Sequence, residues 1–346
     1  MTDMLFEHDW IDMKVDRLRM AFSDDIGSVG EASWLKVWKL CVLVWKTWGK
    51  VISSRPKVLY YLPASPNLTP VVRDIVYLGI VRWFFPKLVF HFHAGGLDEF
   101  YRKRKWLGRL TKFVYNGADC AIDVNITDPP SGEYFQAKKT KIVMNGLSVG
   151  QATRLRPDNG ELHLLYVGLL CEEKGILELV DVANRLKQDG VVCEFVMVGG
   201  WESSDVQSRF EQKATATSVS EMFHFKGALS GSAKWQAYAD ADIFLFPTHH
   251  PTETFGLVMI EAMAYGLPIV TNRWRGVPHV IGKSGCAKLC EVGEPEQYAL
   301  AIQEIVNDDA LRQKMSAAAT QRYQSQFTSE HFLSSMEKVF VEVLES

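Results

Sequence analysis

The run Leu162-His-Leu-Leu-Tyr-Val167 ends in Gly168, and the run Cys193-Glu-Phe-Val-Met-Val198 ends in Gly199-Gly200. Between them, residues 175–188 carry apolar side chains at helical spacing. Short apolar runs that alternate with helices are typical of βαβ units, whose parallel strands are buried on both faces. This stretch therefore predicts an α/β fold built on a parallel sheet.

The same alternation extends along the chain on both sides of this stretch. In the second half we expect strands at 222–225, 242–246 and 268–271, helices ending near 217, 239 and 264, and a purely helical segment from 294 to 346. In the first half we expect strands at 57–62, 88–93 and 121–124, and helices at 33–50 and 99–115. The turn signal Asn145-Gly146 and the polar residues 148–161 favour a first domain at 1–150 and a second at 151–330. A C-terminal helix at 331–346 is expected to pack back towards the first domain.

The composition is that of a folded protein of 346 residues, with 47% apolar and 23% charged residues. It excludes a disordered chain, a collagen and a coiled coil. The net charge of -3 conceals a contrast between the two halves. Residues 1–150 hold 21 basic and 15 acidic side chains, whereas residues 151–346 hold 17 and 26. We therefore expect the first half to meet an anionic surface.

The six cysteines form no C-x-x-C pair, so we expect free, buried thiols in a reducing compartment. The first ten residues show no signal-peptide pattern, and no apolar stretch reaches the length of about 18 residues that a membrane span needs. We expect a cytoplasmic chain that does not cross the membrane, although it could lie on the inner face of the cell membrane.

The strongest functional motif is Pro251-Thr-Glu-Thr-Phe-Gly-Leu-Val-Met-Ile-Glu-Ala-Met-Ala-Tyr-Gly-Leu-Pro-Ile-Val270. Glu253 is expected in a loop after a buried strand, and Glu261 inside the apolar helix that follows, where an unpaired carboxylate would be costly. Backbone N–H groups at the start of that helix would form an anion site. These groups belong to Thr254, Phe255 and Gly256. The plainer alternative is a loop acid together with a helix acid that a neighbouring side chain satisfies.

Histidines supply the other candidate site residues. His93 follows an apolar strand and precedes Ala94-Gly-Gly96, which predicts a position at a strand end, whereas His91 is expected to be structural. The pair His249-His250 near Glu253 suggests a metal, but a metal site needs three or four convergent ligands and the sequence offers no such set.

Two basic stretches also contain aromatic residues. In residues 33–50, Trp34, Trp38, Val42 and Trp45 share one helical face and four lysines share another. Residues 101–112 carry six basic side chains with Trp106, Leu107 and Leu110 between them. One interpretation is a core helix and a solvated helix. The other is a face for an anionic membrane surface, which Trp with Lys and Arg suits. Nucleic acid is disfavoured, because no recognised binding motif accompanies the charge.

With these motifs in order, the chain resembles the retaining glycosyltransferases of family four, which have the GT-B fold of two facing Rossmann-like domains. Glu253 and Glu261 stand in the family's Glu-x7-Glu motif. Further matches are Tyr166-Val-Gly-Leu-Leu-Cys-Glu-Glu-Lys-Gly175, Val196-Met-Val-Gly-Gly200, Phe225-Lys-Gly227, Asp240-Ala-Asp-Ile-Phe-Leu-Phe-Pro247, Val143-Met-Asn-Gly146 and His91-Phe-His-Ala-Gly-Gly96. The resemblance runs from about residue 50 to 340 and is strongest over 162–285.

The resemblance implies transfer of a sugar from a nucleotide-sugar to an acceptor hydroxyl, with retention of configuration. Glu253 would hold the donor sugar, Glu261 the ribose hydroxyls, and Lys174 with the helix start the diphosphate. The full implied set is catalytic His93 and Glu253, donor-binding Lys174, Thr254, Phe255, Gly256, Leu257 and Glu261, and acceptor-side Gly95 and Gly96. No metal and no cofactor beyond the nucleotide-sugar is implied. The acceptor would be a sugar or a lipid-linked glycan of bacterial surface polysaccharide or glycolipid synthesis.

The chain also departs from the family's pattern. Leu169 stands where the family has an arginine facing the diphosphate, and Arg275 and His279 replace a glycine and a glutamate. No counterpart of the family's first strand and Gly-rich loop is recognisable before Ser33, so we expect weak transfer by this chain. A non-catalytic partner subunit and a nucleotide-sugar epimerase of the same fold stay open. A dehydrogenase is disfavoured, because no G-x-G-x-x-G follows a strand.

Overall fold

The structure is a computed structural model that describes residues 2–10, 13–18, 20, 34–94, 97–126, 129–156 and 160–346. The chain divides into two compact units. The first comprises residues 1–145 and 332–346, and the second comprises residues 146–331. The change of unit at Asn145 and Gly146 coincides with the turn signal of the sequence, a few residues before the expected boundary at 150.

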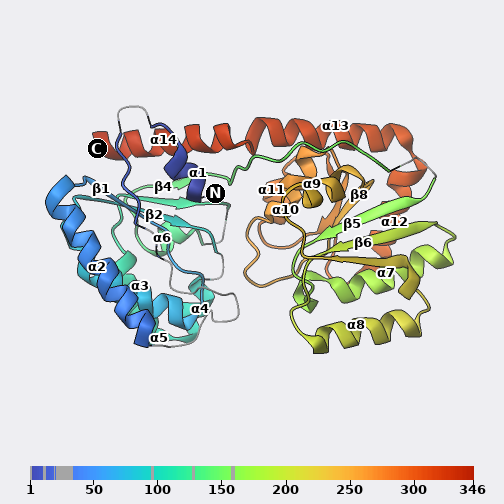
Figure 1. Cartoon of the computed structure of the whole chain (residues 1–346), viewed down its shortest axis with the longest axis horizontal. Coiled ribbons are helices and arrows are strands. Elements are labelled where there is room, and N and C mark those ends of the chain that lie inside the picture. Colours follow the sequence, from blue (N-terminus) through green and yellow to red (C-terminus); the bar gives the residue numbers. More distant parts are fainter. Residues whose placement is uncertain are drawn as a thin grey trace. The chain divides into compact units, whose positions relative to one another are not determined.

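The first unit is built on a four-stranded parallel sheet in the order β1-β2-β3-β4 (Figure 1). The strands are β1 (Val58–Tyr61), β2 (Lys87–Phe92), β3 (Cys120–Asp123) and β4 (Thr140–Ile142). The three strands expected in this half are present, within one or two residues of their predicted bounds. Successive side chains of a strand point to opposite faces. Both faces of this sheet are covered, and most side chains of β2 and β3 are therefore apolar and buried.

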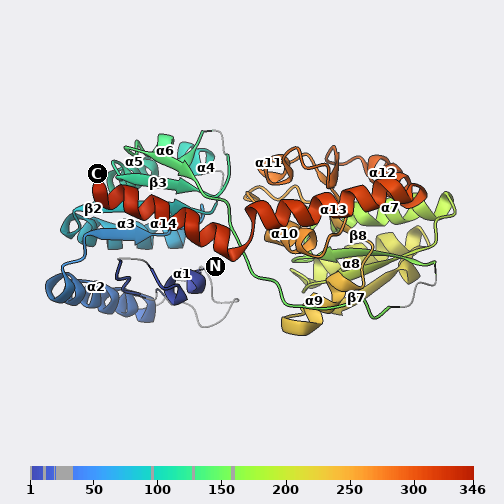
Figure 2. The same cartoon turned by 90° about the horizontal axis from the view of Figure 1, so that it is seen from above.

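Helices cover the two faces of the first sheet in different ways (Figures 1 and 2). On one face, Phe90 and Phe92 of β2 pack in a cluster with side chains of α2 (Trp34–Ser54), α3 (Leu68–Val81) and α5 (Lys105–Tyr115). On the other face, Val89 and Ile122 pack against α14 (Ser329–Glu345), from Phe332 onwards. The other helical elements among the described residues of this unit are α1 (Thr2–Glu7), η2 (Arg82–Phe84), α4 (Leu97–Lys103) and α6 (Ser131–Tyr134).

Three expectations for the first half need correction. The single helix expected at 99–115 is two helices, α4 and α5, which separate at Arg104. The helices pack so closely that a Cβ on Gly108 would lie 3.2 Å from Tyr101 Cβ. Of the two interpretations of residues 33–50, the core helix does not hold for the tryptophans, because the buried side chains of α2 are Leu43, Val44 and Thr47, whereas Trp34, Trp38 and Trp45 are exposed. Cys41 is exposed, whereas the other five cysteines are buried as expected.

The second unit contains a six-stranded parallel sheet in the order β10-β9-β8-β5-β6-β7. Its strands are β5 (Leu162–Val167), β6 (Cys193–Val198), β7 (Phe223–Gly227), β8 (Ile243–Phe246), β9 (Ile269–Asn272) and β10 (Ala287–Cys290). The α/β prediction is confirmed, because every strand expected in this half is present and all pair in parallel. Only β10 was not anticipated.

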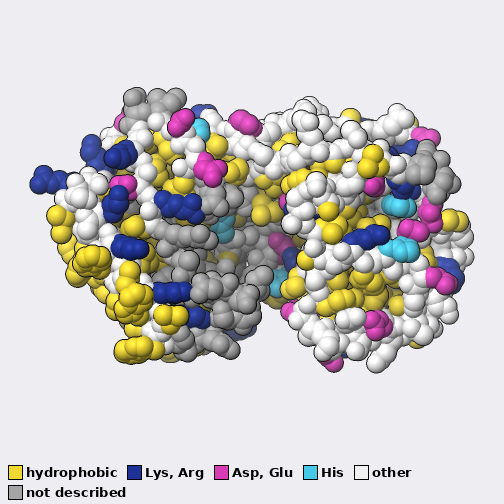
Figure 3. All heavy atoms as spheres, in the orientation of Figure 1, with side chains coloured by type: hydrophobic (Ala, Val, Ile, Leu, Met, Phe, Trp, Pro, Cys, Tyr) yellow, Lys and Arg dark blue, Asp and Glu magenta, His cyan; other side chains and the backbone are white. Residues whose placement is uncertain are grey.

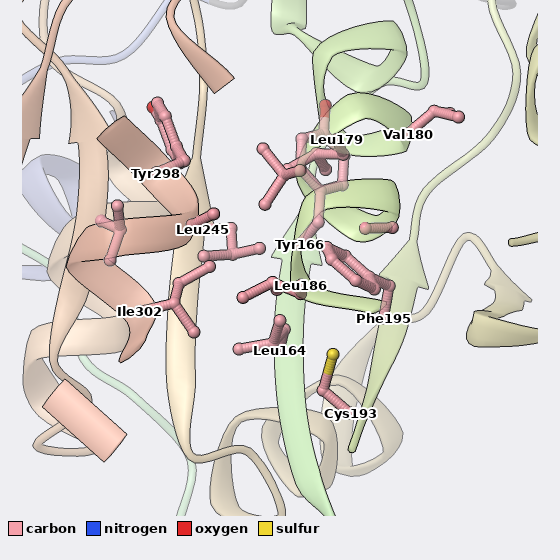
Figure 4. Close-up of a cluster of buried hydrophobic side chains, with 14 of the residues drawn as sticks. Leu164, Tyr166, Leu179, Val180, Leu186, Cys193, Phe195, Leu245, Tyr298 and Ile302 are labelled. Carbon is pink, nitrogen blue, oxygen red and sulfur yellow. The ribbon is translucent and has the colours of Figure 1, made fainter. Parts of the chain in front are cut away.

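Within residues 160–331 the second unit has nine helical elements. They are η3 (Glu172–Lys174), α7 (Ile176–Gln188), α8 (Ser204–Ala216), η4 (Ser220–Met222), α9 (Gly231–Ala239), α10 (Leu257–Ala264), α11 (Val277–Ile281), α12 (Pro295–Asn307) and α13 (Asp309–Gln326). The first seven connect the strands, and α12 and α13 follow β10. Figure 4 shows the core on one face, where Leu164 and Phe195 of the sheet meet Leu179 of α7 and Ile302 of α12. Alternating side chains of the central strands thus build the core that holds β5 and β8 in place.

The direction of the second sheet's winding reverses between β5 and β8. From β5 the chain adds β6 and β7 on one side and then returns to add β8, β9 and β10 on the other. The loops that leave the carboxyl ends of β5 and β8 therefore diverge at this reversal. Open α/β sheets bind their ligands at such a point. These loops carry residues 168–175 and 247–256, which include the strongest motifs of the sequence.

The two loops touch at a glycine. Gly175 has a φ of 77°, and a Cβ built on it would lie 2.2 Å from the carbonyl oxygen of Pro247. No L-residue with a side chain fits this position without moving one of the loops. Two hydrogen bonds from β9 hold the loop after β8 in place. Thr271 Oγ1 donates to the Phe246 carbonyl at 2.8 Å, and Asn272 Nδ2 donates to the Pro247 carbonyl at 2.8 Å.

His91 of β2 is a buried polar residue in the first unit. Its Nδ1 lies 2.7 Å from the Tyr60 hydroxyl, and its ring lies 4.2 Å from the ring of His93, which directly follows the strand. Burial lowers the pKa of His91 well below its usual value, and burial lowers the pKa of His93 to about 4. Both imidazoles are therefore neutral in the folded chain at pH 7.

We expect Gly175→Ala to lower the free energy of unfolding of the second unit by about 2–4 kcal/mol, because the new methyl adds a backbone clash to the strain of a positive φ. Urea denaturation measures the change. Gly190→Ala is the matched control: Gly190 has a φ of 74° but nothing within 4 Å of its Cβ position, so only the cost of the positive φ remains. Equal losses in the two variants would show that the contact with Pro247 is unimportant.

The buried histidines predict that the first unit loses stability in acid. Because the folded pKa lies below the unfolded value of about 6.5, the unfolded chain binds more protons, and each histidine removes about 1.4 kcal/mol per pH unit below pH 6.5 until its folded pKa is reached. Urea denaturation between pH 7.5 and 4.5 should show this slope, and His93→Asn should reduce it. His224→Asn, at a half-exposed position, should leave it unchanged. An unaltered slope in His93→Asn would contradict the lowered pKa of His93.

Candidate functional site

Lys174 and Glu253 form an ion pair where the two loops meet. Lys174 ends η3 after β5, Glu253 lies in the loop after β8, and Lys174 Nζ donates to Glu253 Oε2. The side chains are 21% and 11% exposed, so water screens the pair only partly. Lys174 Nζ also lies 5.3 Å from the centre of the Phe246 ring. A cation and a carboxylate expected to serve one donor are thus side by side in the second unit.

The loop that carries Glu253 leads into α10. The N–H of Glu253 donates to the His250 carbonyl at 3.0 Å, and Thr254 and Phe255 are buried, with Phe255 packed edge-on against Phe327. Gly256 caps the helix with a φ of 70°, and a Cβ there would lie 2.9 Å from Phe246 Cε1. The first turn of a helix leaves N–H groups without an intrahelical acceptor.

Leu257 is the first residue of α10 and is 43% exposed. It stands at the helix start that was expected to face the donor, and its exposed side chain can contact a ligand. The helix is short, eight residues, but its N-terminal end still attracts negative charge through the aligned peptide dipoles. The expected donor-binding residues 254–257 are therefore contiguous at this helix start.

Glu261 is buried one helical turn further along α10, and both carboxylate oxygens have partners. Lys234 Nζ donates to Oε1 at 2.6 Å, and the Tyr238 hydroxyl donates to Oε2 at 2.8 Å. Burial and Glu261 raise the pKa of Tyr238 well above its usual value, so the phenol keeps its proton. Each carboxylate oxygen has a second lone pair, so Glu261 can still accept from a ligand hydroxyl.

Lys234 and Tyr238 are site residues that the sequence reasoning missed. Both lie on α9, and neither belongs to a motif that points to chemistry. Their helix is held by aromatic packing, because Tyr265 at the end of α10 stacks on Tyr238 at 5.7 Å and on Trp235 at 6.3 Å. The only available signal was a lysine four residues before a tyrosine, which puts both side chains on one helix face.

The three positions that depart from the family's pattern lie in the second unit. Leu169, in place of an arginine, is 48% exposed on the loop after β5, and its carbonyl accepts from the Tyr166 hydroxyl at 2.8 Å. Arg275, in place of a glycine, has a φ of 42°, which is the backbone region that glycine favours. His279 lies on α11, and burial with the nearby Arg322 lowers its pKa.

The other candidates from the sequence come from the first half of the chain. His93 belongs to the first unit, directly after β2. Gly95 and Gly96 lie outside the residues that the structure describes. Gly27 and Gly30, near the start of the chain, lie outside them too. Around the β5 and β8 loops, the structure brings together the candidates of the second unit, which are Lys174, Glu253, Thr254, Phe255, Gly256, Leu257 and Glu261.

The histidine pair does not form a metal site by itself. His249 Nδ1 lies 3.4 Å from Glu178 Oε1, whereas His250 Nδ1 lies 3.1 Å from the Thr252 hydroxyl. Among the described residues, two groups bring three potential ligand atoms within 4.8 Å of one another. They are Glu161, His163 and Glu194, and Cys171, Glu173 and Glu202. None of these six residues was expected to act in transfer.

Comparison with known families supports the interpretation of the second unit. Residues 152–322 match the family model described as glycosyl transferases group 1. The matched segment contains β5, β8, α9 and α10, and with them Lys174, Glu253 and Glu261.

Curated relatives are similar over about half of the chain. The chain is 30% identical over 184 residues to a sulfoquinovosyl transferase of Arabidopsis thaliana, which is 50% of this chain and 33% of that protein. It is 25% identical over 221 residues to a capsular polysaccharide biosynthesis glycosyltransferase of Staphylococcus aureus, which is 59% of this chain and 56% of that protein. The chain thus spans about a third to a half of the length of these relatives.

Solved structures match the fold of most of the chain. A sucrose-phosphate synthase from Thermosynechococcus elongatus superposes with a TM-score of 0.71 at 18% identity, covering 89% of this chain and 79% of that one. Anabaena HepE in complex with UDP gives a TM-score of 0.69 at 18% identity, covering 87% and 82%. Two parallel sheets with their helices match the GT-B fold of these glycosyltransferases. Residues 152–322 therefore form a domain of the glycosyl transferases group 1.

Proposed function

We propose that this chain is a retaining glycosyltransferase that moves a sugar from a nucleotide-sugar to an acceptor hydroxyl. The observation that carries the proposal is the Lys174–Glu253 ion pair outside the carboxyl ends of β5 and β8. Ligands of open α/β sheets bind at this place. A cation suited to a diphosphate and a carboxylate suited to sugar hydroxyls are therefore adjacent, inside the segment that matches the family model.

The donor class is a nucleotide-sugar, and UDP is the first probe to use, because Anabaena HepE has been solved in complex with UDP and with UDP-glucose. The acceptor class is a sugar or a lipid-linked glycan. This choice draws on the relatives' names, which include capsular polysaccharide biosynthesis and lipopolysaccharide core biosynthesis glycosyltransferases. The proposed role is thus in a bacterial surface polysaccharide or glycolipid.

The ion pair suggests how the donor would be received. As the diphosphate approaches Lys174, it competes with Glu253 for the ammonium group and releases the carboxylate to accept from hydroxyls of the donor sugar. The N-terminal end of α10, at residues 254–257, adds its dipole to the stabilisation of the diphosphate. Glu261 then accepts from the ribose while Lys234 and Tyr238 hold it in position.

In the transfer step, the bond between the anomeric carbon and the diphosphate oxygen breaks, and the acceptor oxygen bonds to the same face of that carbon. The acceptor proton passes to the departing diphosphate. Lys174 and the α10 N-terminus stabilise the charge that develops on the leaving group, which lowers the barrier. His93 is the catalytic candidate of the first unit, and Gly95 and Gly96 remain the candidates on the acceptor side.

The proposed site needs no metal, because a lysine and a helix N-terminus supply the positive charge. Transfer should therefore continue in the presence of EDTA.

Leu169 favours a second candidate, a subunit that binds the nucleotide without transferring the sugar. With a leucine in place of the family's arginine, Lys174 is the one cation from the motif at residues 166–175 that can face a diphosphate, and Glu253 already neutralises part of its charge. Binding of UDP without transfer or hydrolysis of a nucleotide-sugar would support this candidate over the enzyme.

We expect Lys174→Ala to weaken UDP binding roughly 10- to 100-fold, because a charge-assisted hydrogen bond contributes about 1.5–3 kcal/mol and Glu253 is left without its partner. Leu169→Arg should strengthen binding, because its exposed position admits a cation on the same loop. Isothermal titration with UDP measures both changes. Lys288→Ala removes the same charge from the Lys288–Glu304 pair on β10 and should have no effect. Unchanged affinity in Lys174→Ala would place the diphosphate elsewhere.

The two glutamates should separate in their effects. Glu261→Gln should weaken binding of UDP and of the UDP-sugar together, because both ligands contain the ribose. Glu253→Gln should keep or raise UDP affinity, since it frees Lys174, yet lower transfer, because its contact to the sugar matters in the transition state. Titration beside an activity assay measures both. Tyr238→Phe, which removes one donor to Glu261 but keeps the carboxylate, should weaken UDP binding less than Glu261→Gln. If neither glutamate variant alters binding or transfer, the proposed site is wrong.

A further inference from the structure

The first unit exposes an unusual number of tryptophans on one face. Six of the ten tryptophans are exposed, and all six lie on α2, η2 or α5. Their exposed fractions run from 40% for Trp48 to 85% for Trp34. We call this surface the tryptophan face; its tryptophans are Trp34, Trp38, Trp45, Trp48, Trp83 and Trp106. Tryptophan exposed to this extent is expensive in water, so the face needs a partner.

Ring contacts join the three elements into one surface. Trp48 of α2 lies 6.1 Å from Phe84 of η2, and Trp83 of η2 lies 5.6 Å from Phe113 of α5. Figure 3 shows hydrophobic side chains gathered on the side of the first unit where Figure 1 places α2, with Lys and Arg side chains among them. The exposed apolar residues are thus continuous over several helices rather than scattered singly.

The spacing of the tryptophans along α2 places them on the outward side of the helix. Leu43, Val44 and Thr47 are buried against the unit, whereas Trp38 and Trp45 lie on the opposite side of the helix and are 60% and 73% exposed. The helix therefore has two apolar faces, of which the core uses only one. An apolar stripe that the core does not need indicates a function outside the fold.

The charge of the surrounding helices is strongly one-sided. The residues of α2, α3, η2 and α5 include nine lysines and arginines, and their one acidic residue is Asp74. Asp74 is fully buried, where it accepts from the Tyr61 and Tyr115 hydroxyls at 2.7 and 2.8 Å. Arg82 is buried, Arg73 pairs with Asp74 and Lys50 pairs with Asp16. The other six basic residues leave these helices with positive accessible charge, and an anionic partner is complementary to it.

We propose that the tryptophan face docks on the headgroup region of an anionic lipid bilayer. Indole rings favour the boundary between water and lipid, and lysines beside them favour anionic headgroups. A second copy of the chain fits less well, because the same face on both partners would bring like charges together. Within the described residues no helix has the length and apolar character to cross a bilayer, so the chain would lie on its surface.

The inference goes beyond the proposed function, because it concerns where the chain meets its acceptor and not the donor site. A lipid-linked acceptor would be reached at that surface. The two proposals can fail separately, because lipid binding and UDP binding are measured in different assays and involve different residues.

Flotation with vesicles of phosphatidylglycerol and phosphatidylcholine tests the docking surface on the full chain. We expect flotation with the mixed vesicles and much less with phosphatidylcholine alone. Trp38→Gln with Trp45→Gln should lower the partition coefficient about tenfold or more at both low and high salt, because apolar contact is not screened. Leu300→Gln with Val192→Gln is the matched control, since these side chains are 59% and 69% exposed in the second unit. It should bind like the unaltered chain.

The charge is tested by Lys46→Gln with Arg109→Gln, both exposed on α2 and α5. We expect a loss of roughly fivefold per residue at low salt and little loss at high salt. Lys314→Gln, exposed on α13, is the control for charge alone. Circular dichroism and UDP titration of each variant confirm that it folds and keeps the donor site.

Three results would overturn the proposal. The first is no flotation with anionic vesicles. The second is flotation that the tryptophan variant leaves unchanged. The third is concentration-dependent self-association in sedimentation velocity that the tryptophan variant abolishes while lipid binding is absent, which would make the face an interface between two copies.

Discussion

The close approach of two loops at Gly175 is the constraint on which the arrangement of the donor site depends. The loop after β5 and the loop after β8 can meet only because residue 175 has no side chain to collide with the Pro247 carbonyl. That contact brings Lys174, the residue just before the glycine, next to Glu253 on the other loop. Thr271 and Asn272 of β9 hold the second loop from the side. The backbone contact between Gly175 and Pro247 thus determines that Lys174 and Glu253 form an ion pair.

Both carboxylates of the site are paired within the chain, but in different ways. Glu261 is held by a lysine and a tyrosine of α9, so its orientation is settled before a ligand arrives. The Glu253 side chain is about as buried as that of Glu261, but its partner is one lysine, and a competing anion can take that lysine from it. The first arrangement suits a binding residue that does not move. The second suits a residue that is released when the donor binds, since the cost of separating the pair is offset by the diphosphate.

In the first unit, different helices cover the two faces of the sheet. On one face, the apolar side chains of β2 and β3 are covered by α14, which returns from the far end of the sequence. On the other, α2, α3 and α5 cover the sheet and present a second apolar surface outwards. The inner contacts bury the core of the unit, whereas the outer tryptophans leave much of their surface exposed. Their exposure is therefore a cost that a partner must offset.

The amino-acid sequence alone predicted the α/β class, the position of most strands and the resemblance to a glycosyltransferase family, because short apolar runs and turn glycines act locally and recur in a recognisable order. It also located Lys174, Glu253 and Glu261 on the correct loops and helix. Tertiary structure decided which groups those residues meet: the pairing of Glu261 with Lys234 and Tyr238 joins α9 to α10, and no local pattern encodes it. It likewise divided the helix expected at 99–115 and turned the α2 tryptophans outwards. Periodicity shows that a helix has an apolar face, but only the packing of the other elements decides whether that face is buried, because burial depends on contacts between residues far apart in the chain.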